Sequence, residues 1–206
     1  MPPSLGAKGH AMGEDMTGRV RKRFEEALAT IRLTDEHLAG RVVQAAGLII
    51  EAHRSGGGVL LFGNGGSAAD AQHIAGELVG RFQRERRALR AVALTTDSSV
   101  LTSIANDYDF RRVFARQIEG LARPGDVAVG LSTSGNSPSV VEGLAAARRM
   151  GLKTVAFTGA GGGKCAALAD VLLDVPARPA ARVQEAHAVL YHVLCELVED
   201  AAAEAE

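Results

Sequence analysis

The chain has 206 residues and a formal net charge of -1 at pH 7, because 24 Asp and Glu residues balance 23 Lys and Arg residues. This balance argues against a global positive field that would hold nucleic acid or an anionic membrane. Aromatic residues make up only 4% of the chain, which also argues against stacking on single-stranded nucleic acid. No apolar run approaches the roughly 18 to 20 residues of a membrane span. The length suits one domain.

The ends of the chain and its cysteines indicate the compartment. Residues 1–16 lack the apolar core of a signal peptide, and Cys165 and Cys195 form no C-x-x-C motif. We therefore expect reduced thiols in a cytoplasmic protein. Residues 1–16 mix glycine, proline and charge without periodicity, which predicts a mobile extension followed by a single domain over residues 17–206.

Two helices are predicted next, starting near Thr17. Apolar residues at spacings of three and four indicate the first helix, up to Ile31. Thr34 or Asp35 is expected to cap the second helix, which the run Ser55-Gly56-Gly57-Gly58 ends.

Beyond them, short apolar runs alternate with helical stretches. The predicted strands are 59–62, 91–94, 127–131, 154–157 and 171–175. The predicted helices are 68–79, 99–105, 110–121, 139–150, a short one at 165–169, and a long closing helix over 182–200. This alternation predicts an α/β fold with an open five-stranded parallel sheet, flanked by added N-terminal helices and a long C-terminal helix.

In open parallel sheets, ligands bind where the chain leaves a strand. The loop Ser132-Thr133-Ser134-Gly135-Asn136-Ser137 follows the third predicted strand and precedes a helix with Pro138 in its first turn. Hydroxyls beside unpaired helix N–H groups favour a phosphate monoester. The alternative is that Ser137 only caps the helix. No Lys follows the glycine, so the loop is not a nucleoside triphosphate P-loop.

The loop after the first predicted strand allows a rival interpretation. Gly63, Gly65 and Ala68 match the dinucleotide pattern G-x-G-x-x-A. This pattern also expects an acidic residue about 20 positions later, at the end of the second strand. Glu85 has that spacing but precedes the strand, and Asp97 follows the strand but lies about ten residues too far along the chain. The glycines are better explained by close approach of the backbone to a small ligand.

Polar residues lie on one face of the helix that follows this loop. Asp70, His73 and Glu77 are spaced by three and four residues. A His/Glu pair at i and i+4 can hold a divalent metal or act as an acid/base pair. A solvated helix face is the alternative, but the position just after a strand exit favours a site.

On the closing helix, Gln184 and His192 can share one side, about 80° apart on the helical wheel, whereas His187 points elsewhere. Their axial separation of about 12 Å means that joint contact with one ion requires both side chains to reach inward, or ligands from different subunits. The alternative for His192 is a hydrogen-bonded buried histidine.

The string Gly63-Asn64-Gly65-Gly66-Ser67-Ala68-Ala69-Asp70-Ala71-Gln72-His73, followed by Glu77-Leu78, resembles the signature of the phosphoheptose isomerases of the sugar isomerase (SIS) fold. The resemblance continues through Ala105-Asn106-Asp107-Tyr108, the loop 132–137, and Arg182-Val183-Gln184-Glu185-Ala186-His187 with His192. It covers about residues 20–200.

The resemblance implies an enzyme that interconverts sedoheptulose 7-phosphate and an aldoheptose 7-phosphate of the D-glycero-D-manno type. It implies that Glu77 moves a proton between C1 and C2 through an enediolate, with His192 as partner acid/base, and that the protein is a homotetramer with sites at subunit boundaries. The implied Zn²⁺ ligands are His73, Glu77, Gln184 and His192. The implied substrate contacts are Asn64, Gly65, Gly66, Ser67, Glu77, Asn106, Asp107, Ser132, Thr133, Ser134, Ser137 and Gln184.

Ala181 departs from the pattern, because some relatives carry Asp there. Two other functions stay open. One is a regulatory SIS protein resembling the bacterial replication-initiator-associating protein, although relatives of that type lose the residues matching Glu77 and His192. The other is isomerisation of another phosphosugar.

Overall fold

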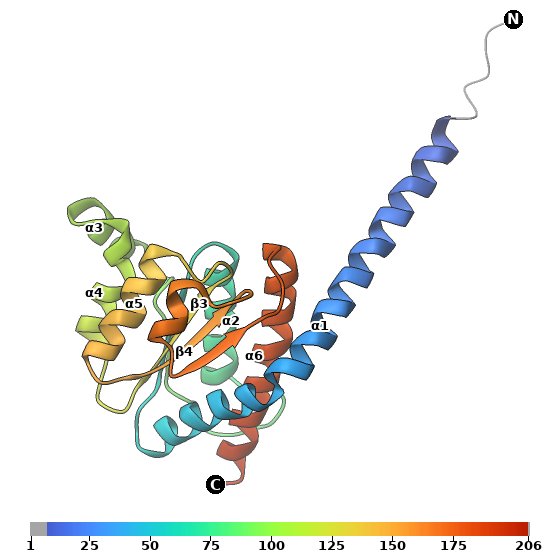
Figure 1. Ribbon diagram of the computed structural model, residues 1–206. Helices are drawn as coiled ribbons and strands as arrows, with labels where there is room; N and C mark the ends of the chain where they lie inside the picture. The colour runs from blue at the N-terminus through green and yellow to red at the C-terminus, as the bar shows by residue number, and fades with distance from the viewer. Residues whose placement is uncertain (1–7, 206) are drawn as a thin grey trace, which may run out of the picture.

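The computed structural model describes residues 8–205, with side chains from Asp15 onwards. Within these residues, five parallel strands form one sheet in the order β2-β1-β3-β4-β5, with helices on both faces (Figure 1). The strands are β1 (Val59–Gly63), β2 (Ala91–Ala93), β3 (Val127–Ser132), β4 (Lys153–Thr158) and β5 (Val171–Asp174). The helices are α1 (Lys8–Arg54), α2 (Gly66–Val79), α3 (Ser98–Asp107), α4 (Val113–Leu121), α5 (Pro138–Arg149) and α6 (Ala180–Ala203), with 3₁₀ helices η1 (Phe110–Arg112) and η2 (Gly163–Leu168). The predicted parallel α/β fold is confirmed.

The sheet separates two apolar cores, because successive side chains of a strand point to opposite faces. From β1, Val59 and Leu61 belong to the core shared with α1, α2 and α6, whereas Leu60 and Phe62 belong to the core under α4 and α5. Burial on both faces explains why the strands are continuous apolar runs in the sequence. Each fully buried Leu or Phe contributes about 1.5–3 kcal/mol.

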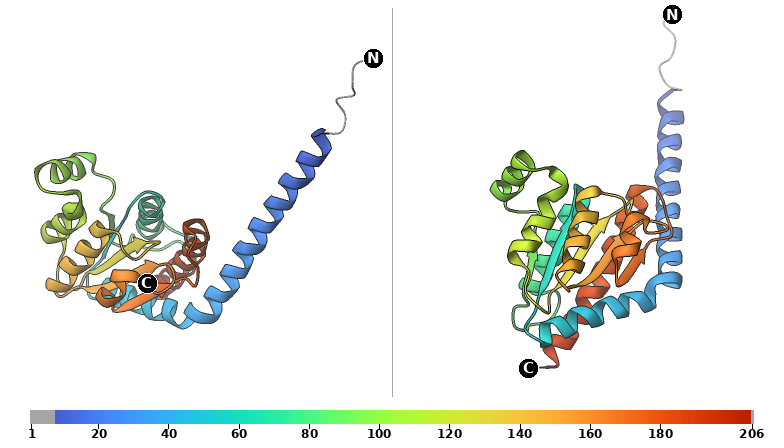
Figure 2. Two further views of the ribbon diagram at one scale, coloured as in Figure 1. Left: turned by 45° about the horizontal axis from the view of Figure 1, so that its top comes forward. Right: turned by 60° about the vertical axis from the view of Figure 1, so that its left-hand side comes forward.

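The prediction of two N-terminal helices is wrong: α1 is one helix, and it begins at Lys8 rather than near Thr17. Thr34 does not cap a new helix, because its hydroxyl donates to the carbonyl of Thr30 at 2.8 Å, and Thr30 bonds back to Glu26 at 2.9 Å. Such back-bonding bends helices without ending them. Figure 2 shows α1 changing direction between its blue and cyan parts. The predicted mobility of residues 1–16 stays a prediction, and residues 1–7 lie outside the described residues.

Two other predicted helices differ in detail. The stretch predicted as one helix over 110–121 divides into η1 and α4, and the short helix near Cys165 is the 3₁₀ helix η2. Both cysteines are free and buried. Burial raises the pKa of Cys165 to about 11 and that of Cys195 to about 12.

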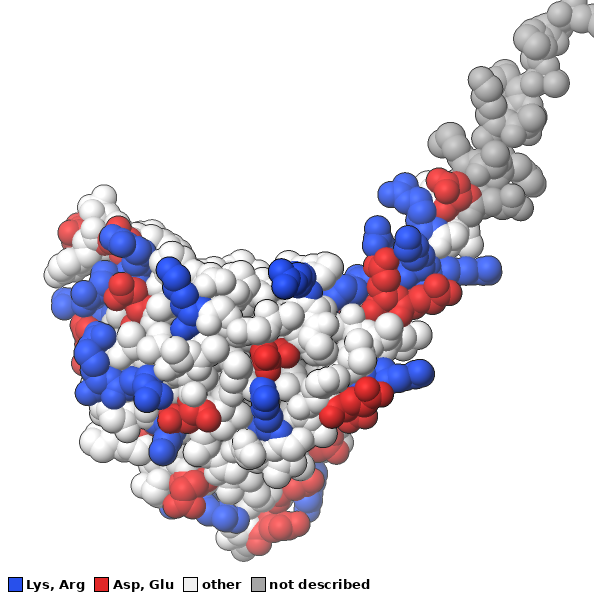
Figure 3. Space-filling model, viewed as in Figure 1, with Lys and Arg blue, Asp and Glu red and all other residues white. Residues whose placement is uncertain are grey.

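The charges of the described residues are mixed over the face seen in Figure 3, where Lys and Arg alternate with Asp and Glu. This agrees with the near-zero net charge. None of the described helices is both long enough and apolar enough to cross a membrane.

His187 points away from His192, as predicted, and the structure places it in the core. Its side chain is fully buried on α6, and its Nε2 donates to the carbonyl of Thr158 at 3.1 Å. The ring meets Phe157 edge-on with centroids 5.6 Å apart. Burial lowers the pKa of His187 to about 4, although the bond to Thr158 opposes the shift.

We therefore expect the free energy of unfolding to decrease as the pH falls from about 6.5 to about 4. In this window the unfolded chain binds a proton at His187 and the folded chain does not, so stability present above pH 6.5 is lost on acidification, by about 3 kcal/mol for this group. His187→Gln should flatten that slope in urea unfolding measured across the window. The control is His37→Gln on the exposed surface of α1. An unchanged slope in His187→Gln would contradict the assignment.

Gly135 is required where the loop after β3 packs on the loop after β4. Its φ is +63°, and a Cβ there would collide with the backbone carbonyl of Gly162. Gly161 has a φ of +83°, but a Cβ would meet none of the described atoms within 4 Å. We expect Gly161→Ala to cost only backbone strain, about 1–2 kcal/mol, and Gly135→Ala to cost clearly more. Thermal unfolding of the two variants checks this, and equal costs would exclude the collision.

Candidate active site

The loops that leave β1 and β3 meet at the carboxyl edge of the sheet. β1 lies between β2 and β3, so the chain order reverses there, which is where open α/β sheets bind ligands. The side-chain amide of Asn64 donates to the hydroxyls of Ser137 at 2.8 Å and Ser139 at 2.9 Å. Two loops far apart in sequence are thus joined into one surface.

The hydroxyl loop after β3 leads into the amino end of α5. The hydroxyl of Ser132 accepts from the backbone N–H of Ser137 at 3.4 Å, and that of Ser134 accepts from Asn136 N–H at 3.1 Å. Among the described residues, Ser137 makes no side-chain cap on α5, and its hydroxyl instead accepts from Asn64. The capping alternative is therefore wrong for the Ser137 hydroxyl. An uncapped helix end beside several hydroxyls suits an anion.

The glycine loop after β1 leaves space for a side chain of α6. Gly65 has a φ of +58°, which allows the tight turn into α2. A Cβ on Gly66, the first residue of α2, would collide with the side-chain amide of Gln184 in the second turn of α6. The bare backbone at Gly66 therefore makes room for Gln184, and Ser67 behind it is buried.

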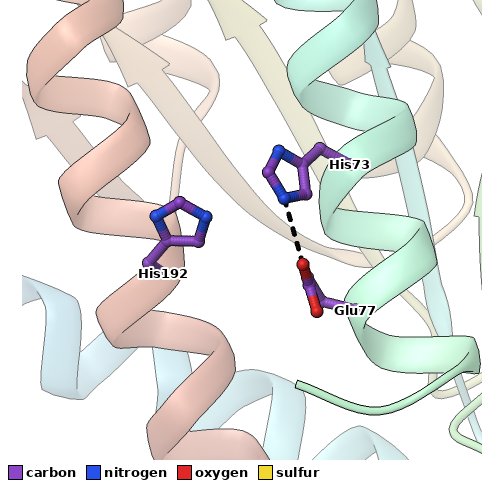
Figure 4. Close-up of side chains that lie close together, drawn as sticks. All are labelled: His73, Glu77 and His192. Atoms are coloured by element: carbon purple, nitrogen blue, oxygen red, sulfur yellow. Dashed lines mark hydrogen bonds and ion pairs between the residues drawn. The ribbon is translucent and has the colours of Figure 1, made fainter. Parts of the chain in front are cut away.

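His73, Glu77 and His192 lie together between α2 and α6 (Figure 4). His73 Nε2 lies 3.0 Å from Glu77 Oε1, and the His73 and His192 ring centroids are 5.1 Å apart. One ligand atom from each residue lies within 4.8 Å of those from the other two. Side chains of His73 and Glu77 are 45% and 20% exposed, so a small ligand can reach them.

This donor set fits a zinc ion in its chemistry. Two imidazole nitrogens and a carboxylate oxygen are typical zinc ligands, and catalytic zinc sites use three protein ligands with one open position. The hydroxyl of Tyr191 lies 3.2 Å from His73 Nδ1, which orients the ring with Nε2 toward the cluster. Outer partners of this kind are typical of metal-binding histidines.

Gln184 lies away from this cluster, against Gly66. Helices α2 and α6 run side by side, since Gln184 meets Gly66 and Tyr191 meets His73, seven residues further along both helices. Seven residues correspond to about 10 Å of helix. The structure therefore brings three of the four predicted metal ligands together and places the fourth at the glycine loop.

Asp70 adds a second carboxyl on the same face of α2. It is half-buried, and its Oδ2 has no hydrogen-bond partner among the described residues. Burial raises the pKa of Asp70, and the neighbouring His73 only partly opposes this. Burial also raises the pKa of Tyr191, and the negative charges of Asp70 and Glu77 add to that effect.

Asn106 and Asp107 lie elsewhere in the chain. They end α3 and are exposed, with Asn106 donating to Asp107 at 2.8 Å. Figures 1 and 2 show α3 at the opposite side of the molecule from α6. Within one chain, these two predicted substrate contacts do not reach the cluster.

Sequence reasoning missed Tyr191, which orients His73, and Phe82, whose ring stacks on His192 with centroids 5.7 Å apart and planes at 16°. Tyr191 could have been found as the neighbour of His192 on the closing helix. Phe82 lies in a charged stretch without periodicity, so its sequence carries no such signal.

Comparisons with known proteins agree with this geometry. The SIS domain family model matches residues 23–159. The phosphoheptose isomerase of Aquifex aeolicus is 54% identical over 185 residues, covering 90% of this chain and 97% of the relative. The solved phosphoheptose isomerase GmhA of Neisseria gonorrhoeae is 45% identical with a TM-score of 0.85, covering 90% of this chain and 99% of its own. The solved phosphoheptose isomerase of Francisella tularensis is 31% identical with a TM-score of 0.87, covering 90% of this chain and 98% of its own.

The sheet order, the joined loops and the His/Glu cluster thus occur in a chain that matches these isomerases over nearly their whole length. The chain therefore belongs to the phosphoheptose isomerase family of SIS-fold enzymes, and it is a phosphosugar isomerase.

Proposed function

We propose that the protein interconverts sedoheptulose 7-phosphate and an aldoheptose 7-phosphate of the D-glycero-D-manno type, as a cytoplasmic homotetramer. The observation that carries the proposal is the cluster of His73, Glu77 and His192, on two helices whose amino ends meet at the glycine loop. The cluster lies about 10 Å along these helices from that loop. An extended phosphosugar can therefore place its phosphate at the loops and its reacting carbons at the cluster.

The phosphate end would be held by neutral donors. The hydroxyls of Ser132, Thr133, Ser134 and Ser137 would contact it, together with the first N–H groups of α5. Asn64, Gly65, Gly66, Ser67 and Gln184 would contact the sugar from the other loop. Binding energy from the phosphate, remote from the reaction, orients the C1–C2 end.

Glu77 and His192 would carry the proton transfers. The Glu77 carboxylate removes a proton from C1, the C1–H electrons form the C1–C2 double bond of the enediolate, and the C2 carbonyl electrons move onto its oxygen. Return of the proton to C2, with formation of a carbonyl at C1, completes the isomerisation. His192, on the opposite helix, exchanges protons with the two oxygens.

A zinc ion would be held by His73, Glu77 and His192, and by Gln184 if its amide turns from Gly66 toward the cluster. Such an ion supplies charge that stabilises a developing oxyanion.

We expect Glu77→Gln to lower kcat for sedoheptulose 7-phosphate by about 10²–10⁴-fold, because the amide cannot accept the proton. Aldose formation is measured with and without a chelator, and activity lost to the chelator should return with Zn²⁺. Glu85→Gln, exposed outside the site, is the control. Retained activity in Glu77→Gln would exclude it as the base. Turnover of a pentose or hexose phosphate alone would reassign the substrate.

The homotetramer is supported by apolar surface on the described part of α1. Val20, Phe24 and Leu28 are 54%, 67% and 65% exposed on one face. A groove of about 300 Å³ between α1 and α6 continues this surface. The position of Asn106 and Asp107, away from the cluster, also fits a site completed by a neighbouring subunit.

We expect Phe24→Asp to dissociate the assembly, because it buries a charge in an apolar interface. Sedimentation should give four times the 21.4 kDa chain mass for the native protein and less for the variant. Met150→Asp, an exposed apolar position at the end of α5, should keep the native mass. An unchanged mass in Phe24→Asp would remove α1 from the interface.

A further inference from the structure

The irregular segment between α2 and β2 is held from inside by one carboxylate. Glu199 on α6 is 1% exposed. Its carboxylate accepts from the backbone N–H groups of Phe82 at 2.7 Å, Gln83 at 2.6 Å and Arg84 at 2.8 Å. Three N–H groups converging on one carboxylate form a charge-assisted anchor. Burial raises the pKa of Glu199, but these N–H groups and Arg86 outweigh burial and lower it overall.

Arg86 connects this anchor to the end of α2. Its Nε lies 3.5 Å from Glu199 Oε1, and both side chains are buried. Its NH groups donate to the carbonyls of Glu77 at 2.7 Å and Gly80 at 2.9 Å. These carbonyls end α2, where a helix lacks partners for them and favours a cation. The backbone of Glu77 is thereby tied to α6.

The first residue of the anchored segment 82–84 contacts His192. Phe82 stacks its ring on the His192 imidazole with centroids 5.7 Å apart and planes at 16°. Glu199 follows His192 by seven residues, two turns along α6, so both project from one face. The same helix thus carries the imidazole and the carboxylate that accepts from the backbone N–H of Phe82.

We propose that Glu199 is a positioning residue for His192: its carboxylate fixes the backbone of residues 82–84 so that the Phe82 ring holds the imidazole facing Glu77. The kinetic part of this proposal rests on the proposed isomerase function. A buried ion pair is by itself weak evidence for a stabilising role. What points to positioning is that one of the three N–H groups bound by Glu199 belongs to Phe82, the residue that stacks on His192.

The test compares Glu199→Gln and Phe82→Leu with two matched variants. Glu199→Gln keeps the shape but loses the charge and one acceptor, and Phe82→Leu removes the stacked ring while leaving the anchor. Phe82→Tyr keeps an aromatic ring. Asp200→Asn breaks the exposed ion pair to Arg84, at 2.8 Å, on the same segment without touching the anchor.

Two readouts are measured on the protein as purified, with its metal. The first is kcat against KM for sedoheptulose 7-phosphate, and the second is the NMR shift of the His192 ring protons, assigned with His192→Gln. We expect Glu199→Gln and Phe82→Leu to lower kcat by about ten- to a hundredfold, as for misplaced catalytic groups, with KM nearly unchanged. Both should also move the His192 signals, because the ring current of Phe82 is lost or displaced.

Phe82→Tyr should lose much less kcat than Phe82→Leu, and Asp200→Asn should behave as the native protein. A moved His192 signal with native kcat in Phe82→Leu would overturn the proposal. The proposal would also be overturned if Glu199→Gln lowered the melting temperature without moving the His192 signals, because Glu199 would then have a purely structural role. If Glu199→Gln does not fold, Glu199→Asp replaces it, because the shorter side chain keeps the charge but withdraws the carboxylate from the three N–H groups, and it should lower kcat and move the His192 signals in the same way. If the native protein lacks isomerase activity, the proposed function fails, and the NMR shifts still test the contact.

Discussion

The parallel packing of α6 against α2 is the interaction on which the site depends. It lies over the apolar core that both helices share with α1 and one face of the sheet. Because the amino end of α6 packs against the amino end of α2 and the helices run in the same direction, Gln184 meets Gly66 and Tyr191 meets His73. A shift of either helix by one turn, about 5.4 Å, would separate His192 from the His73–Glu77 pair.

The second constraint is the reversal of strand order between β1 and β3. It brings a glycine loop and a hydroxyl loop to one edge, where Asn64 joins them. Neutral hydroxyls and helix N–H groups can hold a phosphate without a basic surface, which explains how a chain of net charge -1 suits an anionic substrate.

The strands, the N-terminal helix and the site differ in how far the sequence predicts them. The strands were predicted nearly to their ends, because burial on both faces leaves continuous apolar runs. The predicted boundary between two helices at Thr34 is wrong. A threonine hydroxyl can cap a new helix or bond back to its own helix, and only its hydrogen-bond partner shows which of the two it does. In the site, the spacing of His73 and Glu77 predicted a shared face, whereas Phe82 and Glu199 gave no local signal.

The sequence by itself determined the fold class, the glycine and hydroxyl loops at the strand ends, and the His/Glu pair on one helix, because these depend on periodicity and on residues near in the chain. Only the tertiary structure decided that His192 completes the pair, that Gln184 lies at Gly66, and that Glu199 holds the segment beneath Phe82. These contacts join residues more than a hundred positions apart. Helix packing, which no local pattern encodes, sets which of their faces meet.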